Sequence, residues 1–520
     1  MSKNKSKNQT KVRPYAVMCT DLYLLWILMV YPLYYADGYF HLPEKKAAFW
    51  CASTLIYLGV TLFGVIISAF SDREQWSLEN IKKNISMTDI FMFGFLISNL
   101  IAFALSEDKV NAWTGASSRY YGAKVLILVC LVYFMVSRYA WVNKVFIWAF
   151  LIAGNGVCLL ATLDYFGMDV LGINKQMMDI DWYMFLATMG NANTCASYVS
   201  MVVAAAITYY CISNTWKDKI IAVISIINCS VALSTTRSDS AALGVAPVIV
   251  ILIFMSIMGK IKAKNVLQML IVFVLTFLGY AGIRKMHEDK LGYLTYYDTG
   301  IPRILWEQIG LMFVVLIVLI FLYIARNIYE SKLKKKSYNK KGVFCGIGIV
   351  GLAVVVFCWK IDLYQVFFTG MGIGETDIVG TRMYNYTRTF EIFKELPSVN
   401  KIFGCGQASI TNIFNRYFGD ELAAAGISIN STHNHMLDYF IIGGLICVVC
   451  YLGIIFFSIK RGFMLLKENM LILVGLMVII AYFIQGLFNI DQTNTTTIFW
   501  LFIALGEAMC RQTVGIKQNK

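Results

Sequence analysis

The feature that most constrains this sequence is a series of apolar runs, each about 18–22 residues long, that recur along its whole length. A helix rises about 1.5 Å per residue, so about 20 apolar residues cross the roughly 30 Å hydrocarbon core of a membrane. Strands of outer-membrane barrels are about half that length and alternate apolar with polar residues. Only 15% of the residues are charged. The sequence therefore predicts an all-α polytopic membrane protein.

We expect about fourteen transmembrane helices from the spacing of these runs. The predicted spans are residues 17–35, 49–70, 88–105, 121–136, 145–163, 194–212, 220–235, 241–258, 266–282, 305–324, 343–359, 436–457, 470–488 and 497–509. They divide the chain into a basic leader (1–16), eleven helices (17–360), a long loop (361–435), three more helices (436–510) and a tail (511–520). No small-residue cleavage site follows the first run, so we expect this helix to be retained.

The net charge of +14 has a simple explanation in the placement of the basic residues. They gather in alternate short loops, at 138–144, 217–219, 260–264, 326–341 and 460–467. This positive-inside pattern predicts that both termini are cytoplasmic and that the long loop is extracytoplasmic. The charge therefore does not indicate nucleic-acid binding. The run Lys334–Lys336 fits the same pattern, with contact to anionic membrane lipid as an alternative.

The thirteen cysteines are an odd number, and nearly all lie inside apolar runs. Cys405 is the only one in the long loop. Neither a disulfide framework nor a CxxC zinc pair can be drawn from this spacing. We expect no metal and no cofactor.

Four polar clusters fall on the predicted extracytoplasmic side. They are residues 113–122, 190–193 and 234–240, and the long loop with Gly380–Arg382, Arg388 and the stretch 431–440. Loops longer than about 12–15 residues are usually functional or disordered. This one contains aromatic residues and a helix-like segment at 384–394, so we expect it to fold over the membrane surface.

Arg237 is the most informative cation, because apolar residues flank its short turn closely. An arginine near hydrocarbon costs several kcal/mol unless it is paired or reaches the interface. Its guanidinium has a fixed fork of donors that suits phosphate oxygens. Arg119, Arg237 and Arg382 come from separate segments and together can hold a diphosphate. An ion pair with Asp239 is the alternative for Arg237, and interface anchoring is the alternative for the other two.

Two of the four histidines lie in the stretch Ser431–Phe440. His433 has a near-neutral intrinsic pKa, so it can take a proton from an attacking hydroxyl. A structural or merely exposed histidine is the alternative, and it weighs more heavily for His435. Asn434 can orient an imidazole or a sugar, but asparagine is also a common helix cap. We assign no role to His41 or His287.

Two short motifs are discounted. His433-Asn434-His435 spells a nuclease label, but that chemistry needs a compact metal-bearing domain on the nucleic-acid side. Asp179 and Asp181 spell a DxD, which binds a metal in some sugar-transferring membrane enzymes. In a single sequence that signal is very weak.

The order of the motifs resembles the O-antigen ligase and O-antigen polymerase superfamily of integral-membrane glycosyltransferases. The first half contributes G…R..G at 115–122, GN.N at 190–193 and S..R at 234–237. The second half contributes Gly380–Arg382, then P..G.G at 397–406, then HN..L at 433–437 with Gly443. Each motif alone is weak, but the order and the common face are fairly specific.

The resemblance implies a bacterial cytoplasmic-membrane enzyme whose donor is an undecaprenyl-diphosphate-linked glycan. It places Arg237 and Arg382 on the diphosphate and makes His433 the base, with inversion and without a metal. We also predict substrate contacts from Arg119, Asn193, Asn434 and His435. The sequence departs from the family in having Tyr386 where tryptophan is frequent, His435 at a variable position, and more than the usual twelve or so helices. The excess leaves the alignment of residues 284–341 open.

Three functions are compatible with these features. A polymerase would join lipid-linked repeat units into a cell-surface polysaccharide, and we favour it because no appended domain suggests a protein acceptor. A ligase would transfer the glycan to another acceptor. A transporter of lipid-linked sugar is less favoured, because ion-coupled carriers place ionisable residues deep in helices, whereas here the informative charges lie at the outer ends.

Overall fold

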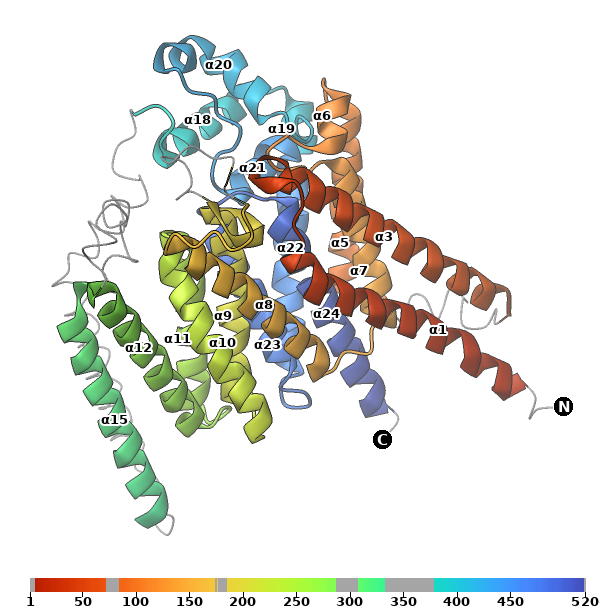
Figure 1. Ribbon diagram of the computed structural model, residues 1–520. Helices are drawn as coiled ribbons and strands as arrows, with labels where there is room; N and C mark the ends of the chain where they lie inside the picture. Colours follow the sequence, from red (N-terminus) through yellow and green to blue (C-terminus); the bar gives the residue numbers. More distant parts are fainter. Residues whose placement is uncertain are drawn as a thin grey trace.

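The computed structural model describes residues 5–71, 84–173, 175, 185–286, 307–332 and 378–518, and these residues form a helical bundle (Figure 1). Ten helices of the described chain are long and apolar enough to cross a membrane. The described residues pair as strands only in β1 (Phe185–Leu186) and β2 (Gly190–Asn191). The prediction of an all-α, multi-pass membrane protein is confirmed.

The helices of the bundle are α1 (Lys5–Leu25), continued by a π-helical turn (Trp26–Val30) and α2 (Tyr31–Leu33), α3 (Gly38–Ser71), α5 (Met87–Leu105), α7 (Ala123–Tyr139), α8 (Lys144–Tyr165), α9 (Ala192–Ile212), α10 (Trp216–Thr235), α11 (Asp239–Ile257), α12 (Ala263–Met286), α15 (Ile309–Lys332), α22 (Gly444–Met464), α23 (Ile472–Gly486) and α24 (Thr493–Gln518). The shorter helices are α6 (Lys109–Thr114), α18 (Arg382–Glu395), α19 (Ser398–Phe403), α20 (Ile410–Ala425), α21 (His435–Ile442) and a 3-10 turn (Ala187–Met189).

Every predicted span coincides with a helix except 343–359, which lies outside the described residues, as do Asp179, Asp181 and His287. The structure adds one break, because the predicted span 436–457 is divided into α21 and α22. The predicted helix within the long loop is confirmed as α18.

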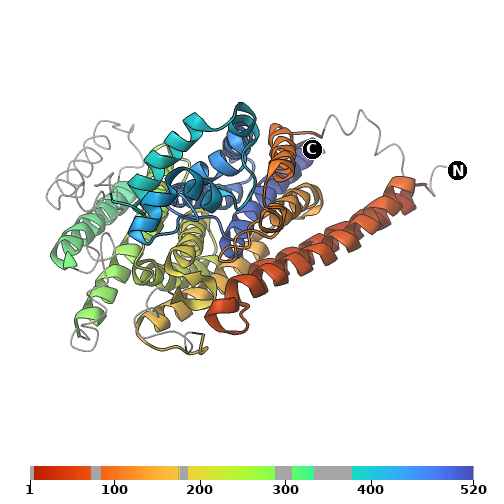
Figure 2. The same cartoon turned by 90° about the horizontal axis from the view of Figure 1, so that it is seen from above.

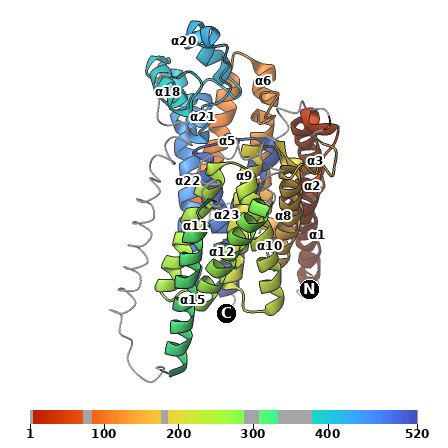
Figure 3. The ribbon, with the colours of Figure 1, turned by 60° about the vertical axis from the view of Figure 1, so that its left-hand side comes forward.

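The bundle has two different ends (Figures 1 and 3). Helices α6, α18 and α20 lie at one end, which we call the upper end, while α1 begins and α24 ends at the other (Figure 3). At the lower end, Asp89 pairs with Arg138 at 3.2 Å and with Arg511 at 2.5 Å, and Glu507 pairs with Arg461 at 2.5 Å. Seen from above, the N-terminal helices project from one side of the bundle (Figure 2).

Helix α9 lies at the centre and is almost wholly buried against α8, α10, α11 and α23. Small side chains such as Ala204–Ala206 let its neighbours approach closely, as is typical of helix packing in membranes. Gly244 of α11 likewise allows α23 to approach closely. A Cβ at this position would lie 2.6 Å from the Ala481 carbonyl oxygen. These close contacts fix the helix ends that carry the polar loops.

The break between α21 and α22 is stabilised by a distant turn. The backbone N–H groups of Cys405 and Gly406 donate to the carbonyl oxygens of Ile441 and Ile442, at 2.9 and 3.0 Å. Carbonyl groups released by a helix break need such partners when they are buried. The P..G.G segment and the glycines after α21 therefore form one backbone contact.

Replacing Gly444 by alanine is expected to destabilise this junction. Its φ of +69° is a left-handed conformation, and a Cβ would lie 2.5 Å from the Gly404 nitrogen. The strained backbone alone costs about 1–3 kcal/mol, so the thermal midpoint in detergent should fall. Gly279→Ala in α12 is the matched control, since nothing lies within 4 Å of the new atom. Equal midpoints for the two variants would contradict the packing described.

Candidate active site

The loop between α23 and α24, residues 487–492, connects the predicted polar clusters at the upper end. Asn489 donates its side-chain amide to the Asn193 carbonyl oxygen at 2.7 Å. The Leu487 carbonyl oxygen accepts from the Tyr386 hydroxyl at 3.2 Å. Just beyond the loop, the Thr493 N–H donates to the Arg119 carbonyl oxygen at 3.3 Å. We call this segment the hub loop.

Sequence reasoning missed the hub loop, although a signal is present. Nine residues in a row, from Asn489 to Thr497, include only one apolar side chain, Ile490, yet they lie between two apolar spans. The structure buries Asn489, Asp491 and Gln492. Buried polar groups of this kind are hydrogen-bonded, so such a run indicates a polar network between helices.

Arg119 is held in a tight loop between α6 and α7. Gly115 has a φ of +86°, and the loop closes where Gly115 meets the backbone of Tyr121 and Gly122 so tightly that a Cβ would clash. Arg119 is 8% exposed, and its guanidinium lies 3.5 Å from an Asp438 oxygen. Its Nη2 donates to the Asn430 side-chain oxygen. Burial lowers the pKa of Arg119, while the carboxylates of Asp438 and Asp491 oppose that shift.

Asp438 fixes the loop that precedes α21. It accepts hydrogen bonds from the Ser431 hydroxyl, the Thr432 hydroxyl and the Thr432 N–H, each at 2.8 Å. Together with the Arg119 pair, these contacts satisfy a carboxylate that is only 6% exposed. Asp438 lies in the stretch 431–440, but sequence reasoning gave it no role. We infer that Asp438 positions both the loop and the arginine.

His433 lies in this loop with a φ of +60°, which non-glycine residues rarely adopt. Its N–H donates to the Ser431 hydroxyl at 2.9 Å, and its carbonyl oxygen accepts from the Tyr386 hydroxyl at 3.3 Å. Burial, with the nearby charges of Arg382 and Arg119, lowers the pKa of His433 to about 4, and Asp438 opposes the shift. The imidazole is therefore neutral at neutral pH and can accept a proton.

Arg382 is the first residue of α18. The Thr381 hydroxyl caps the helix by accepting from the Tyr384 N–H at 3.3 Å. Burial lowers the pKa of Arg382, while Tyr386 and Asp239 act in the opposite direction. Asp239 is two residues from Arg237, so the turn that holds Arg237 lies within electrostatic reach of Arg382.

Arg237 stacks on an aromatic ring at the end of α8. Its guanidinium lies 4.7 Å from the centre of the Tyr165 ring. Arg284 of α12 lies 5.6 Å from the same ring and donates to its hydroxyl. Arg284 is 1% exposed, and sequence reasoning gave it no role. The sequence nevertheless contained a signal for Arg284. It is a basic residue at the predicted extracytoplasmic end of a helix, where the positive-inside pattern disfavours positive charge.

Asn193 joins the second and third predicted clusters. Its side-chain oxygen accepts from the Ser238 hydroxyl at 2.8 Å, next to Arg237. Asn191 caps α9 by accepting from the Asn193 N–H at 2.8 Å, and Gly190 turns the chain there with a φ of +88°. The GN.N motif thus has a structural cause: a turn, a cap and a contact.

Asn434 caps α21, accepting from the Met436 and Leu437 N–H groups at 2.9 and 3.3 Å. This is the structural alternative considered for it. His435 points into the bundle and is fully buried. Its Nε2 lies 3.3 Å from the Tyr451 hydroxyl, and the ring packs against Gly486 without room for a Cβ. The structure therefore does not bring the His435 ring to the arginines.

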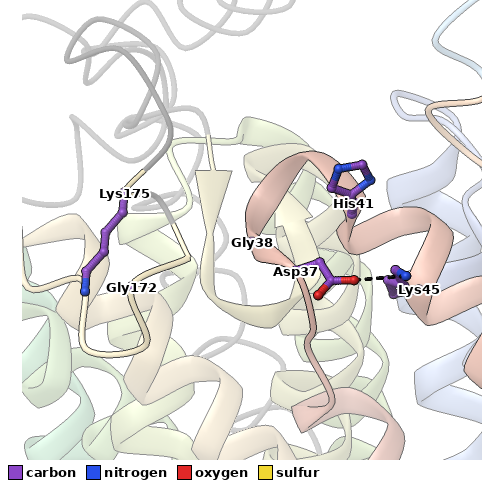
Figure 4. A pocket seen from close by; sticks show the side chains of 6 residues that line it. All are labelled: Asp37, Gly38, His41, Lys45, Gly172 and Lys175. Carbon is purple, nitrogen blue, oxygen red and sulfur yellow. Dashed lines mark ion pairs between the residues drawn. The ribbon is translucent and has the colours of Figure 1, made fainter.

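Arg388 of the fourth polar cluster and His41, to which no role was assigned, also lie elsewhere. Arg388 connects α18 to α20 through ion pairs with Glu391 at 2.7 Å and Glu421 at 3.1 Å. His41 borders an open hollow of about 570 Å³, with Lys45 paired to Asp37 at 2.9 Å (Figure 4). None of the residues predicted to bind substrate lines this hollow.

The remaining arrangement is a neutral imidazole beside buried guanidinium groups. In the described chain, six non-glycine residues have positive φ, and three of them are Tyr120, Arg237 and His433. Strained backbone of this kind gathers at functional sites. Such a site can bind an anion and accept a proton from a neighbouring hydroxyl.

A family model described as O-Antigen ligase matches residues 307–452. This range includes Arg382, His433 and Asp438, whereas Arg119, Asn193 and Arg237 lie before it. No curated protein matches the sequence.

Proposed function

Because the chain belongs to the O-antigen ligase and O-antigen polymerase superfamily, whose members are glycosyltransferase-like membrane enzymes, we propose that it elongates a cell-surface glycan. The donor is a glycan linked to a polyprenyl diphosphate of the undecaprenyl type. The acceptor is a hydroxyl group of a second lipid-linked glycan. The observation that supports this most strongly is that Asp438 pairs with Arg119 at 3.5 Å and also holds, through Thr432 at 2.8 Å, the loop that contains His433.

The arginines supply what the leaving group needs. A diphosphate departs with negative charge, and guanidinium groups bind its oxygens two at a time. Donors that are already fixed in a site of low dielectric stabilise charge that develops in the transition state. Asp438 holds the Arg119 guanidinium, and the Thr493 N–H just beyond the hub loop holds its backbone, so the cation is positioned before the substrate arrives. Arg237 and Arg284 extend the cationic surface along Tyr165.

His433 acts on the other partner. Its neutral imidazole removes the proton from the acceptor hydroxyl as that oxygen attacks the anomeric carbon of the donor. The new carbon–oxygen bond forms while the bond from this carbon to the diphosphate oxygen breaks. Lipid diphosphate leaves with the bonding electrons, and a direct displacement of this kind inverts the anomeric configuration. Asn193 positions the Arg237 turn through Ser238.

The pKa of His433 should depend on whether the donor is bound. Arg382 and Arg119 lower it in the free protein, after burial itself. A bound diphosphate compensates their charges, which raises the pKa and makes the imidazole a stronger base. The profile of kcat/KM against pH reports the free enzyme, and that of kcat reports the substrate complex. We therefore expect kcat/KM and kcat both to decrease as the pH is lowered, with a higher apparent pKa in the kcat profile than in the kcat/KM profile.

This comparison has a clear contrary result. If the apparent pKa is the same in both profiles, or is lower in kcat, the bound diphosphate does not compensate the positive charges of the arginines. Arg388→Gln is the control for the measurement, since Arg388 pairs with Glu391 and Glu421 and is not among the charges that act on His433.

The proposal assigns an orientation in the bacterial cytoplasmic membrane. The upper end, with α18–α21, is extracytoplasmic, and both termini are cytoplasmic. The basic residues Arg138, Arg461 and Arg511 support this, because they gather with Asp89 and Glu507 at the opposite end. Positively charged loops are typical of the cytoplasmic side.

Turnover by the purified full-length protein tests the function. The protein in lipid nanodiscs is supplied with a polyprenyl-diphosphate-linked repeat unit. A ladder of products spaced by one repeat, with release of the lipid diphosphate, is the expected result. A single added block on a foreign acceptor would instead establish a ligase, and translocation without any new glycosidic bond would establish a transporter.

A further inference from the structure

A second polar pocket lies at the upper end of the bundle, outside the group of residues around His433. It is a cavity of about 210 Å³ between the α5–α6 junction and helices α19 and α20. Its lining includes Glu107, Asp108, Gln407, Asn412, Arg416 and Tyr417. The volume is below the roughly 300–1,000 Å³ of sites for drug-sized ligands, which suits a single ring.

Gln407, one of the lining residues, has a buried polar side chain. Its side chain is 1% exposed, and its amide nitrogen donates to the Asn99 side-chain oxygen at 2.9 Å. The opposite oxygen, Oε1, is buried without a hydrogen-bond partner. Leaving such a group unsatisfied costs about 1–3 kcal/mol.

The charge of the pocket indicates which ligands it accepts. Glu107 and Asp108 are acidic, and Arg416 pairs with Glu107 at 2.6 Å. Two carboxylates and one guanidinium leave a net charge of −1, so a phosphate or another anion would be repelled. The Asn412 amide can both donate and accept, as a sugar hydroxyl requires. The ring of Tyr417 provides an apolar face for the C–H groups of a sugar ring.

The position of the pocket relates it to the proposed reaction. Its wall contains the turn Cys405–Ser409, whose N–H groups bond the carbonyl oxygens at the end of α21. His433 lies just before the start of that helix. Helix α21 has eight residues, so it is about 12 Å long at 1.5 Å per residue. The pocket wall and His433 are therefore separated by about the length of α21.

We propose that this pocket binds one uncharged or amino-bearing sugar ring of the glycan, at a distance from the reacting end. The inference rests on the proposed function, because only a glycan substrate would extend from His433 to this pocket. Both donor and acceptor glycans have this chemistry. Binding here holds the glycan in register, so that the terminal hydroxyl or the anomeric carbon is presented to His433.

Binding of the free saccharide tests the site separately from turnover. The probe is the repeat-unit oligosaccharide released from its lipid by mild acid, titrated calorimetrically into the full-length protein. We expect Asn412→Ala and Tyr417→Ala each to weaken binding about tenfold, as the loss of one good polar or ring contact implies. Tyr417→Phe retains the ring and should bind like the wild type. Asn415→Ala, exposed on the same helix but not lining the pocket, is the matched control.

Turnover then identifies which glycan occupies the pocket. A raised KM for the acceptor alone places the acceptor there, and a raised KM for the donor alone places the donor there. Wild-type affinity in both alanine variants, or no saccharide binding by the wild type, would overturn the site. Failure of the proposed function is a different outcome, since the wild type would then form no product whatever the saccharide affinity.

Discussion

Replacing His433 by alanine should lower the turnover number by about 10²–10⁴-fold, the usual contribution of a positioned general base. The imidazole is neutral, and both neighbouring arginines act on it, so its removal leaves no equivalent acceptor for the hydroxyl proton. Donor affinity should change little, because the imidazole is not a phosphate ligand in this account. Initial rates of polyprenyl-diphosphate release, measured beside the KM for the donor, distinguish these two effects.

The matched control for this variant is His41→Ala. His41 is an exposed histidine at the border of the open hollow, with a contact of 3.8 Å to Glu44, and it does not contact the arginines. Its replacement should leave both kcat and KM unchanged. The base assignment fails if His433→Ala retains wild-type turnover, or if it loses activity only because less protein reaches the membrane.

Asp438→Ala should have the largest effect on the integrity of the site. The carboxylate accepts three hydrogen bonds from Ser431 and Thr432 and pairs with Arg119. Its removal leaves a buried guanidinium and buried donors without this partner, which costs about 3–5 kcal/mol. We therefore expect a lower thermal midpoint together with loss of turnover, measured by unfolding in detergent and by product formation.

Asp438→Asn separates the two roles of this carboxylate. An amide of the same shape can still accept from Thr432, but it removes the negative charge beside Arg119. It should regain part of the lost stability while turnover remains low. Asp420→Asn, on the exposed face of α20, should change neither quantity. Wild-type stability and activity in Asp438→Ala would contradict the positioning role.

The fold was largely predictable, because hydrocarbon thickness sets the length of a span. The break at Gly443 was not predicted, since the partners that stabilise it, Cys405 and Gly406, lie almost forty residues earlier in the chain. An apolar run looks continuous when its broken carbonyl groups are bonded to a distant segment. Hydropathy alone therefore cannot predict a helix break that is stabilised by distant backbone partners.

The candidate site was predictable only in part, for a similar reason. Arg119, Arg382 and His433 were selected by residue type and predicted side, and the structure places both arginines within electrostatic reach of His433. The sequence already favoured His433 over His435, and the structure gives the reason: His433 lies before α21, whereas His435 is its buried first residue. The helix start decides which ring faces the arginines. Asp438 and Arg284 were missed because their partners come from distant segments.

Arginines from separate segments are proposed to bind one lipid diphosphate beside His433. The most direct measurement is the affinity of the full-length protein for undecaprenyl diphosphate, which is bound without turnover. Arg237→Gln and Arg382→Gln should each weaken binding about tenfold to a hundredfold, the value of a charge-assisted contact. His433→Ala, and Arg388→Gln on the same helix as Arg382, should bind like the wild type. Wild-type affinity in both Arg237→Gln and Arg382→Gln would contradict the account.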